Sequence, residues 1–209
     1  ELKAADLSDT TLVRSHFQKA NLMEATLRRA DLRESDMDQC DLRKADLTYC
    51  DLRQVKLSGT QCEAADMQWA DLTGSQMTAS VLKASRLNHA KLNRVDLGKS
   101  VLTLADLSDT HMQGAHLKGA DLRQARLSKA DLRQADLSDT ACIGADLSGA
   151  DISGAEIDRI NMSDWTIKGI HCTHALRGGK RLEFAAGQFE RIYSVAENIT
   201  GLALPVPLS

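Results

Sequence analysis

The sequence predicts an all-β solenoid, a chain that coils around one axis and turns at a short, fixed interval. An apolar residue returns at every fifth position, without a break in register, from Leu2 to Ile157. A small residue stands two positions before almost every one of these centres, and the positions between carry mostly Asp, Arg, Lys, Gln, Ser, Thr and Gly. Because a chain that bends once per repeat can send both apolar positions to a shared interior and the polar ones to water, these observations favour a solenoid.

The step of five excludes the two simplest alternatives. An α-helix turns about 100° per residue, so a step of five advances about 140° and scatters the centres around the helix instead of forming a stripe. A flat strand alternates its faces with period two, so an odd step would send successive centres to opposite sides of a sheet. Neither a single amphipathic helix nor a plain half-buried strand fits the pattern.

The centres are aliphatic with few exceptions, and the small positions are tight. Every centre is Leu, Met, Ile, Phe or Cys, and the only aromatic one is Phe17. The small positions hold Ala, Ser, Thr or Cys for the most part, with Val55 and Val95 the bulkiest among the repeats. Both positions are therefore expected to face a narrow interior filled by aliphatic side chains.

The repeats resemble a known family. The segments ADLSD, ANLME, ADLRE, ADLTG, ADLRQ and ADLSG match the A(D/N)LXX signature of the pentapeptide-repeat proteins. The resemblance covers most of the chain and implies a right-handed quadrilateral β-helix in which four repeats make one coil. It predicts a rod of about eight coils stacked at ~4.8 Å per coil.

The domain division follows from the point at which the five-residue repeat ends. From Met162 onward the small position is occupied by Ile160, Trp165 and Ile170, and the pattern is gone by Arg177. We therefore assign residues 1–172 to the pentapeptide-repeat β-helix and residues 173–209 to a C-terminal cap or tail.

The tail is expected to cover the last coil with a short helical or irregular cap. Apolar residues at helical spacing predict a helix around 183–197, and the candidate cap or dimer contacts are Phe184, Phe189, Ile192 and Tyr193. Since an open sheet end must be covered, capping is the favoured interpretation. The alternative is a homodimer formed through the C-terminal tail. The resemblance to the family suggests this alternative, because some family members dimerise through a C-terminal helix.

The first residues indicate a fragment or a processed chain. The sequence begins at Glu1, and Leu2 already occupies a repeat centre. Because solenoid ends normally carry a cap, we expect the chain to be part of a larger bacterial protein.

The composition indicates neither a nucleic-acid partner nor a membrane-spanning segment. The net charge is −3, and no run of apolar residues is long enough to span a bilayer. We expect a cytoplasmic protein that makes no direct contact with nucleic acid, with a secreted effector as the alternative.

No residue pattern indicates catalysis. The sequence holds no nucleophile and base at a recognisable spacing, no glycine-rich phosphate loop and no metal-ligand motif. The five cysteines occupy inward positions too far apart to pair, so they are interpreted as small core residues. We expect no catalytic residue, no cofactor and no metal, and therefore not an enzyme.

Charged residues at a spacing of twenty form a candidate acidic row. If coils stack, Asp31, Asp51 and Asp71 are neighbours, and the row continues, after Lys91 and His111, at Asp131 and Asp151. Such a row is similar to the acidic ladder of a DNA-mimicking rod. An arginine follows Asp31, Asp51 and Asp131 two residues later, however, so we interpret the surface as self-compensated.

A few apolar residues occupy outward positions and form a candidate partner surface. Val81 and Val101 replace the usual Asp and should stack directly, with Leu104 nearby and Trp69 on a neighbouring face. Outward apolar residues on a charged rod indicate a contact for a protein partner whose identity the sequence does not reveal.

Three functions remain open. The favoured one is a non-catalytic scaffold or protein–protein interaction module. The second is a DNA-mimicking inhibitor of DNA gyrase or topoisomerase IV that confers quinolone protection, although such family members are more acidic and richer in phenylalanine at the centres. The third is the repeat domain of a secreted bacterial effector.

Overall fold

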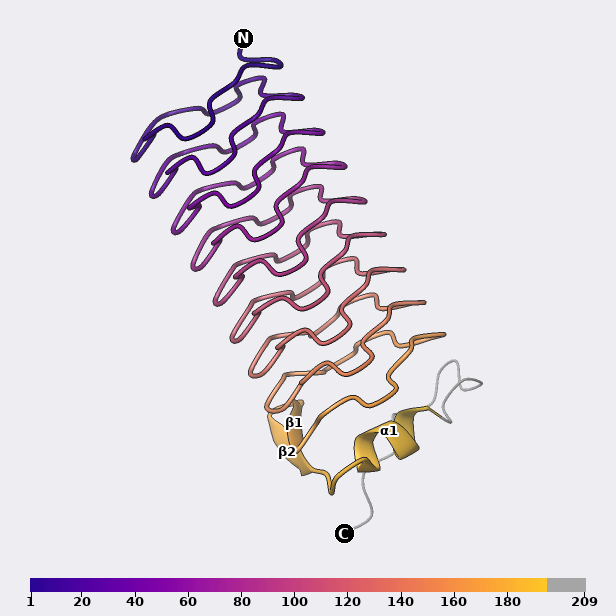
Figure 1. Cartoon of the computed structure of the whole chain (residues 1–209). Helices are drawn as coiled ribbons and strands as arrows, with labels where there is room; N and C mark the ends of the chain where they lie inside the picture. Colours follow the sequence, from indigo (N-terminus) through magenta and orange to yellow (C-terminus); the bar gives the residue numbers. More distant parts are fainter. Residues whose placement is uncertain (195–209) are drawn as a thin grey trace.

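The protein is a stack of coils closed at its C-terminal end by a hairpin and a short helix (Figure 1). The structure is a computed structural model that describes residues 1–194. Parallel bridges join the residue before each centre to the residue 20 positions later, from Asp6↔Thr26 to Glu156↔Leu176. Because a bridge falls at every fifth residue, each 20-residue coil has four sides. The repeat period therefore produces a four-sided β-helix.

Each repeat has one conformation. The residue before the centre, the bridge position, faces outward and pairs with the coils on either side, while the centre faces inward. Two turn residues follow, and the second of them has a positive φ at every fifth position from Ala4 to Gly169. The next residue is the small one, and its N–H closes the turn on the carbonyl of the centre, as in Ala5 to Leu2 at 3.0 Å.

The second turn position explains part of the sequence pattern. Positive φ is comfortable for glycine and costs other residues about 1–2 kcal/mol each. Between Ala4 and Gly169 this position is held by glycine or by residues that are not branched at Cβ, never by Val, Ile or Thr. This fits the steric rule, because a β-branched side chain is the least tolerated in the left-handed region.

The centres fill the interior as columns of aliphatic side chains. Leu42, Leu92 and Leu132 are completely buried, together with nearly all other centres from Leu22 to Ile157. The centres of the first coil, from Leu2 to Phe17, are only partly buried. Backbone hydrogen bonds run beside the columns: the N–H of Leu92 donates to the carbonyl of His111 at 2.7 Å, and that of Lys91 to the carbonyl of Ala70 at 2.9 Å.

Some small inward positions carry hydroxyl groups, and these differ in whether they find a partner. The Ser80 hydroxyl donates to the Met77 carbonyl at 2.6 Å, and the Thr110 hydroxyl to the Leu107 carbonyl at 2.7 Å. The hydroxyls of Ser35 and Ser75 are buried without a hydrogen-bond partner. Such orphaned polar atoms are rare in folded proteins because they keep the full cost of desolvation.

The C-terminal cap begins as a continuation of the last coil. Strand β1 (His174–Arg177) pairs antiparallel with β2 (Lys180–Glu183), and Leu176 of β1 also bridges Glu156. The bridge pattern thus runs past residue 172, where the sequence placed the end of the β-helix. Gly178 and Gly179, both with positive φ, make the two-residue turn of this hairpin.

The helix of the cap is shorter than the range predicted for it. Helix α1 spans Gln188–Tyr193, whereas the sequence predicted a helix around 183–197. Glu183 belongs to β2, and a turn that contains Gly187 precedes the helix. Residues 195–197 lie outside the described part of the chain. Among residues 1–194, no helix has the length and apolar character needed to cross a bilayer.

The leucine column predicts a steep dependence of stability on its members. We expect Leu92→Ala to lower the free energy of unfolding by about 2–5 kcal/mol, since the cavity would lie in a fully buried column. Leu92→Asp should prevent folding, because it buries a charge without a partner. Denaturant unfolding monitored by circular dichroism measures both effects. Leu104→Ala, at a half-exposed turn, is the matched control and should change stability by less than about 0.5 kcal/mol.

The two kinds of buried hydroxyl should respond to alanine substitution with opposite signs. Ser75→Ala removes an unpartnered polar atom and should raise the free energy of unfolding by about 1 kcal/mol. Ser80→Ala removes a hydrogen-bonded hydroxyl and should lower it by about 1 kcal/mol. Equal losses in the two variants, measured by thermal and chemical unfolding, would contradict this assignment.

Candidate interaction surfaces

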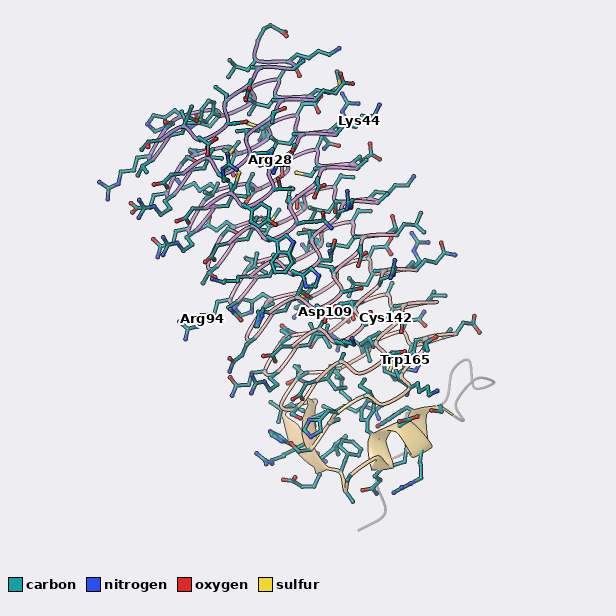
Figure 2. All side chains as sticks on the ribbon, viewed as in Figure 1. Arg28, Lys44, Arg94, Asp109, Cys142 and Trp165 are labelled. Atoms are coloured by element: carbon teal, nitrogen blue, oxygen red, sulfur yellow. The ribbon has the colours of Figure 1, made fainter. Side chains whose placement is uncertain are left out.

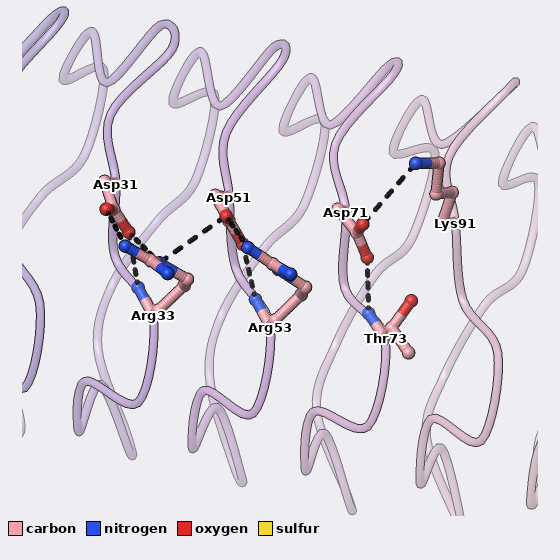
Figure 3. Close-up of polar contacts among 7 residues, drawn as sticks. All are labelled: Asp31, Arg33, Asp51, Arg53, Asp71, Thr73 and Lys91. Atoms are coloured by element: carbon pink, nitrogen blue, oxygen red, sulfur yellow. Dashed lines mark hydrogen bonds and ion pairs between the residues drawn. The ribbon is translucent and has the colours of Figure 1, made fainter.

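The predicted acidic row exists as a line of stacked residues at the bridge position. Asp31, Asp51 and Asp71 are joined by successive parallel bridges and lie in one line in Figure 3. Asp131 bridges Asp151 further along the same face. Lys91 and His111 occupy the bridge position between the two acidic segments. The fold therefore brings the five carboxylates onto one face, but in two groups and not in one continuous ladder.

Arginines at the first turn position neutralise this row. The guanidinium of Arg33 donates two hydrogen bonds to the carboxylate of Asp31, at 2.8 and 2.6 Å. Arg53 donates two to Asp51 in the same way, at 2.8 and 2.5 Å. Arg33 also reaches Asp51 of the next coil at 3.6 Å. We call such a pair, an Asp at the bridge position held by the Arg two residues later, a fork. Forks turn a row of negative charge into a row of local dipoles.

The remaining carboxylates of the row also have partners. Asp131 forms a fork with Arg133 at 2.7 and 2.6 Å. Asp71 lies 3.6 Å from the ammonium group of Lys91 and accepts the backbone N–H of Thr73 (Figure 3), while Asp151 lies 3.1 Å from Nδ1 of His171. Each Asp of the predicted row is thus engaged with a cationic or ionisable neighbour.

The forks also move the titration of the carboxylates. The pKa of Asp131 is lowered below its ordinary 3.8, mainly because Arg133 donates side-chain hydrogen bonds to it, and the backbone N–H of Arg133 acts in the same direction. The pKa values of Asp31, Asp41 and Asp121 are lowered in the same way by Arg33, Arg43 and Arg123. Partial burial opposes this lowering but does not overcome it.

The predicted apolar surface is brought together only in part. Val81 and Val101 stack directly through a parallel bridge, and Leu104, which is 51% exposed, lies at the turn that follows Val101. Trp69 lies at the turn on the far side of the next face, where the outward residues Asp66 and Arg86 form an ion pair at 2.9 Å. The chain therefore separates Trp69 from the two valines by a charged face.

Trp69 belongs instead to an aromatic stack that the sequence analysis missed. Its ring lies between Tyr49, with centroids 6.2 Å apart and planes at 4°, and His89, with centroids 4.2 Å apart and planes at 16°. All three residues occupy the second turn position of one corner, and the signal for them was their spacing of twenty. Tyr49 and Trp69 remain about half exposed, at 53% and 51%, so the stack forms an exposed aromatic surface along this corner.

The cap contacts predicted from the tail form one aromatic cluster. Phe184, Phe189 and Tyr193 are buried, with centroid distances of 4.3–6.3 Å between them, and Ile192 is partly buried. Trp165 of the coils joins the cluster through Phe189 at 6.3 Å and is seen beside the cap in Figure 2. The three aromatic side chains are thus buried by contacts within their own chain, which supports their assignment as cap contacts.

A hydrogen bond ties the cap to the coils at one further point. The side chain of Glu190, in α1, accepts the backbone N–H of Gly169 at 2.9 Å. The carboxylate thereby satisfies a backbone donor at the end of the stack, which would otherwise need another partner.

The polar cluster at His171 lacks the geometry of a catalytic relay, and the described residues contain no group of metal ligands. Ser153 and Asp151 both approach Nδ1 of His171, at 3.2 and 3.1 Å, whereas a nucleophile relay needs them on different ring nitrogens. Within residues 1–194, no three His, Cys, Asp or Glu side chains are placed to hold a metal ion. All five cysteines are buried free thiols, and burial raises the pKa of Cys50 to about 12.

One corner of the rod carries a shallow groove. It has a volume of about 500 Å³, lies where Ala79, Gly98 and Gly119 lack long side chains, and has Lys99, Lys118 and Asp139 at its rim. It is open to solvent, and Asp139 is held by Arg159 at 2.5 and 2.7 Å. The groove therefore lacks the converging polar groups that are typical of a small-molecule site.

Comparison with known proteins gives one family. The sequence profile described as pentapeptide repeats matches in eight copies, at residues 1–39, 20–59, 60–98, 100–139 and 125–164. None of the curated proteins compared with the chain matches it.

Several solved structures are similar to the chain. HetL, a pentapeptide repeat protein involved in heterocyst differentiation regulation in the cyanobacterium Nostoc sp. strain PCC 7120, is 31% identical, with 85% of each chain covered and a TM-score of 0.47. A pentapeptide repeat protein of the Arabidopsis thaliana thylakoid lumen is also 31% identical, with 51% of this chain and 63% of that one covered and a TM-score of 0.32. QnrB1, a plasmid-mediated fluoroquinolone resistance protein, is 13% identical, with 68% of this chain and 84% of that one covered and a TM-score of 0.51.

The forks predict loss of stability in acid. A carboxyl group whose pKa is lower in the folded than in the unfolded chain stabilises the fold above the unfolded value of about 3.9, and this contribution disappears as the pH falls through the folded value. We therefore expect the unfolding temperature to fall between about pH 5 and pH 2. The triple variant Arg33→Gln, Arg53→Gln, Arg133→Gln should lose less over this interval, because the pKa values of Asp31 and Asp131 are then closer to their unfolded values.

The matched control for the triple variant is Arg94→Gln. In residues 1–194, Arg94 takes part in no ion pair, and it projects from the edge of the rod opposite to Lys44 (Figure 2). Arg94→Gln should therefore follow the pH profile of the unmodified protein. A pH profile that is the same in the triple variant and in the unmodified protein would show that the forks do not set acid stability.

Proposed function

Since the chain belongs to the pentapeptide-repeat family, we propose that it is a non-catalytic rod that docks a protein partner or holds attached domains at a fixed spacing. The observation that carries this proposal is the unbroken register of bridges at a spacing of 20 residues, from Asp6 to Leu176. A rod without inserted loops offers flat, repetitive faces and a constant geometry along its length. Both properties suit a spacer or a docking surface better than a reaction site.

The surface supports docking by shape and by local dipoles. Forks and cross-coil pairs such as Arg29 with Asp9, at 2.6 Å, satisfy much of the exposed charge within the chain. A surface of this kind has little long-range field, so partners of high charge gain little from electrostatic steering. The contacts that remain are short-range ones, through exposed apolar groups and the hydrogen-bonding side chains around them.

Inhibition of a type II topoisomerase by DNA mimicry is the alternative. Its support is the fold shared with QnrB1, a fluoroquinolone resistance protein, and the carboxylates stacked at Asp31, Asp51 and Asp71. Each strand of double-stranded DNA carries one negative charge per ~3.4 Å of axis. One carboxylate per coil is one per ~4.8 Å, and forks hold two of these three. The charge density therefore favours the rod without DNA mimicry.

A repeat domain of a secreted bacterial effector is the third candidate. Free thiols such as those of the five buried cysteines are typical of a reducing compartment, and we therefore favour the cytoplasm.

We take the coil to be right-handed, because parallel strands connected across a sheet are right-handed in nearly all proteins. Dimerisation through the tail is less favoured, since Phe184, Phe189 and Tyr193 are buried within one chain.

A supercoiling assay separates the first two functions. We expect the purified protein, at micromolar concentration, to leave the supercoiling activity of DNA gyrase and the decatenation activity of topoisomerase IV unchanged. The variant Arg33→Gln, Arg53→Gln, Arg133→Gln frees the carboxylates of the forks and serves as the matched comparison. Inhibition by the unmodified protein below micromolar concentration would contradict the scaffold proposal, and inhibition by the triple variant alone would show that the forks suppress DNA mimicry.

A further inference from the structure

We propose that one face of the rod is a contact between two copies of this chain, packed face to face with their axes parallel. The face, called the valine face below, has two lines of outward residues. The bridge positions are Asp41, Gln61, Val81, Val101, Asp121 and Ala141, and the first turn positions are Arg43, Glu63, Lys83, Thr103, Arg123 and Ile143. The inference rests on the proposed function and names the partner of that interaction.

The valine face is the least charged of the four faces at its bridge positions. Between Asp41 and Asp121 these positions are Gln61, Val81 and Val101, and parallel bridges join them into one line. The opposite line, from Asp31 to Asp151, carries an ionisable side chain at every coil. Removal of a face from water costs least where the fewest charges must be desolvated. The valine face is therefore the one best suited to pack against another protein surface.

The apolar centre of this face extends to its edge. Val81 and Val101 are partly buried by their neighbours, and Leu104, at the adjoining turn, is 51% exposed. Ala64 and Ala84 occupy the same turn line as Leu104 and are exposed as well. Small and branched apolar side chains on a flat sheet allow a second sheet to approach to ~10 Å.

Two forks close this apolar centre at its ends. Asp41 accepts hydrogen bonds from Arg43 at 2.9 and 2.6 Å, and Asp121 accepts them from Arg123 at 2.8 and 2.6 Å. Both forks have the same direction, with the carboxylate on the bridge line and the guanidinium on the turn line. The face therefore carries two parallel dipoles, one on each side of its apolar centre.

The direction of the forks selects the arrangement of the two copies. A two-fold axis parallel to the rod and between the two lines places Asp41 opposite the second copy's Arg43, and Asp121 opposite the second copy's Arg123. Opposite charges then meet at both ends of the interface. Rods packed with opposite directions and centred on Val81 would instead place Asp41 opposite the second copy's Asp121. Like charges directly opposite each other are unfavourable, so of these two arrangements the parallel one is charge-complementary.

The parallel arrangement also suits the residues between the forks. Val101 then faces the second copy's Thr103, Gln61 faces the second copy's Glu63, and Val81 faces the aliphatic stem of the second copy's Lys83. No two like charges are opposed along the length of the contact. Because the same surface is used by both copies, the assembly closes as a dimer and does not grow into a fibre.

Sedimentation equilibrium of the purified full chain tests the dimer. We expect a dimer whose dissociation constant rises by at least about tenfold in Val101→Asp, since this variant buries a charge that faces the second copy's Thr103 and has no partner there. Asp is the residue that this protein itself places at many bridge positions, so the variant should keep the circular dichroism spectrum of the rod. Gln76→Asp, at the bridge position of another face, is the matched control and should leave the dissociation constant unchanged.

Site-specific crosslinking tests the direction. The five native cysteines are buried, so an introduced cysteine is the accessible thiol of the described residues. Thr103→Cys lies beside the two-fold axis in the parallel arrangement and should form a covalent dimer by itself with a short bis-maleimide crosslinker, since sheets packed ~10 Å apart hold the two thiols too far apart for a disulfide. In the opposed arrangement, Thr103 lies opposite the second copy's Glu63. Crosslinking only in a mixture of Thr103→Cys and Glu63→Cys would therefore overturn the parallel arrangement.

The outcomes also separate this inference from the proposed function. A chain that remains monomeric at high micromolar concentration, or a dimer that withstands Val101→Asp, overturns the contact proposed here. Neither result bears on whether the rod docks a different partner, which the topoisomerase assays address separately.

Discussion

The structure depends on the parallel backbone hydrogen bonds that join each coil to the next. They repeat at every bridge position with a spacing of 20 residues, from Asp6↔Thr26 to Glu156↔Leu176. Once this spacing is set, each centre must lie above another centre, and Leu92 enters a column in which every neighbour is apolar. Each turn must also place its second residue at positive φ. One inserted residue would shift the register of all later repeats and move their leucines out of the interior.

The same spacing determines which surface residues can interact. Residues twenty positions apart become neighbours, so Arg29 reaches Asp9, and Tyr49, Trp69 and His89 stack in one line. The forks add a second, local contact within each repeat. Together these contacts neutralise part of the surface charge locally, and this is the physical reason for favouring a docking rod over a mimic of a polyanion. The valine face differs from the other faces because its bridge line has the uncharged residues Val81 and Val101 between two forks.

Most of the rod could be predicted from the sequence because its determinants are local and repeat. The step of five, the small residue before each centre and the Asp and Arg of each fork are visible in the printed chain, and the structure confirms the inward centres and the stacking of Asp31, Asp51 and Asp71. The cap was predicted less well, because its hairpin and α1 are each a single element without a period. Gly178 and Gly179 were the available signal for the hairpin. The aromatic stack was missed because the spacing of twenty was applied to the bridge positions and not to the second turn position, where Tyr49, Trp69 and His89 lie.

A set of distances along one corner tests the four-sided coil most directly. Spin labels at positions 19 and 99 are separated by 80 residues, and labels at 19 and 159 by 140 residues, all on the same turn line. At ~4.8 Å per coil, the backbone separations should be ~19 and ~34 Å, with narrow distributions, in double electron–electron resonance measurements. Distances that increase in this proportion support a stiff stack with 20 residues per coil. Distances that do not scale with the number of coils, or distributions as broad as those of an unfolded chain, would contradict it.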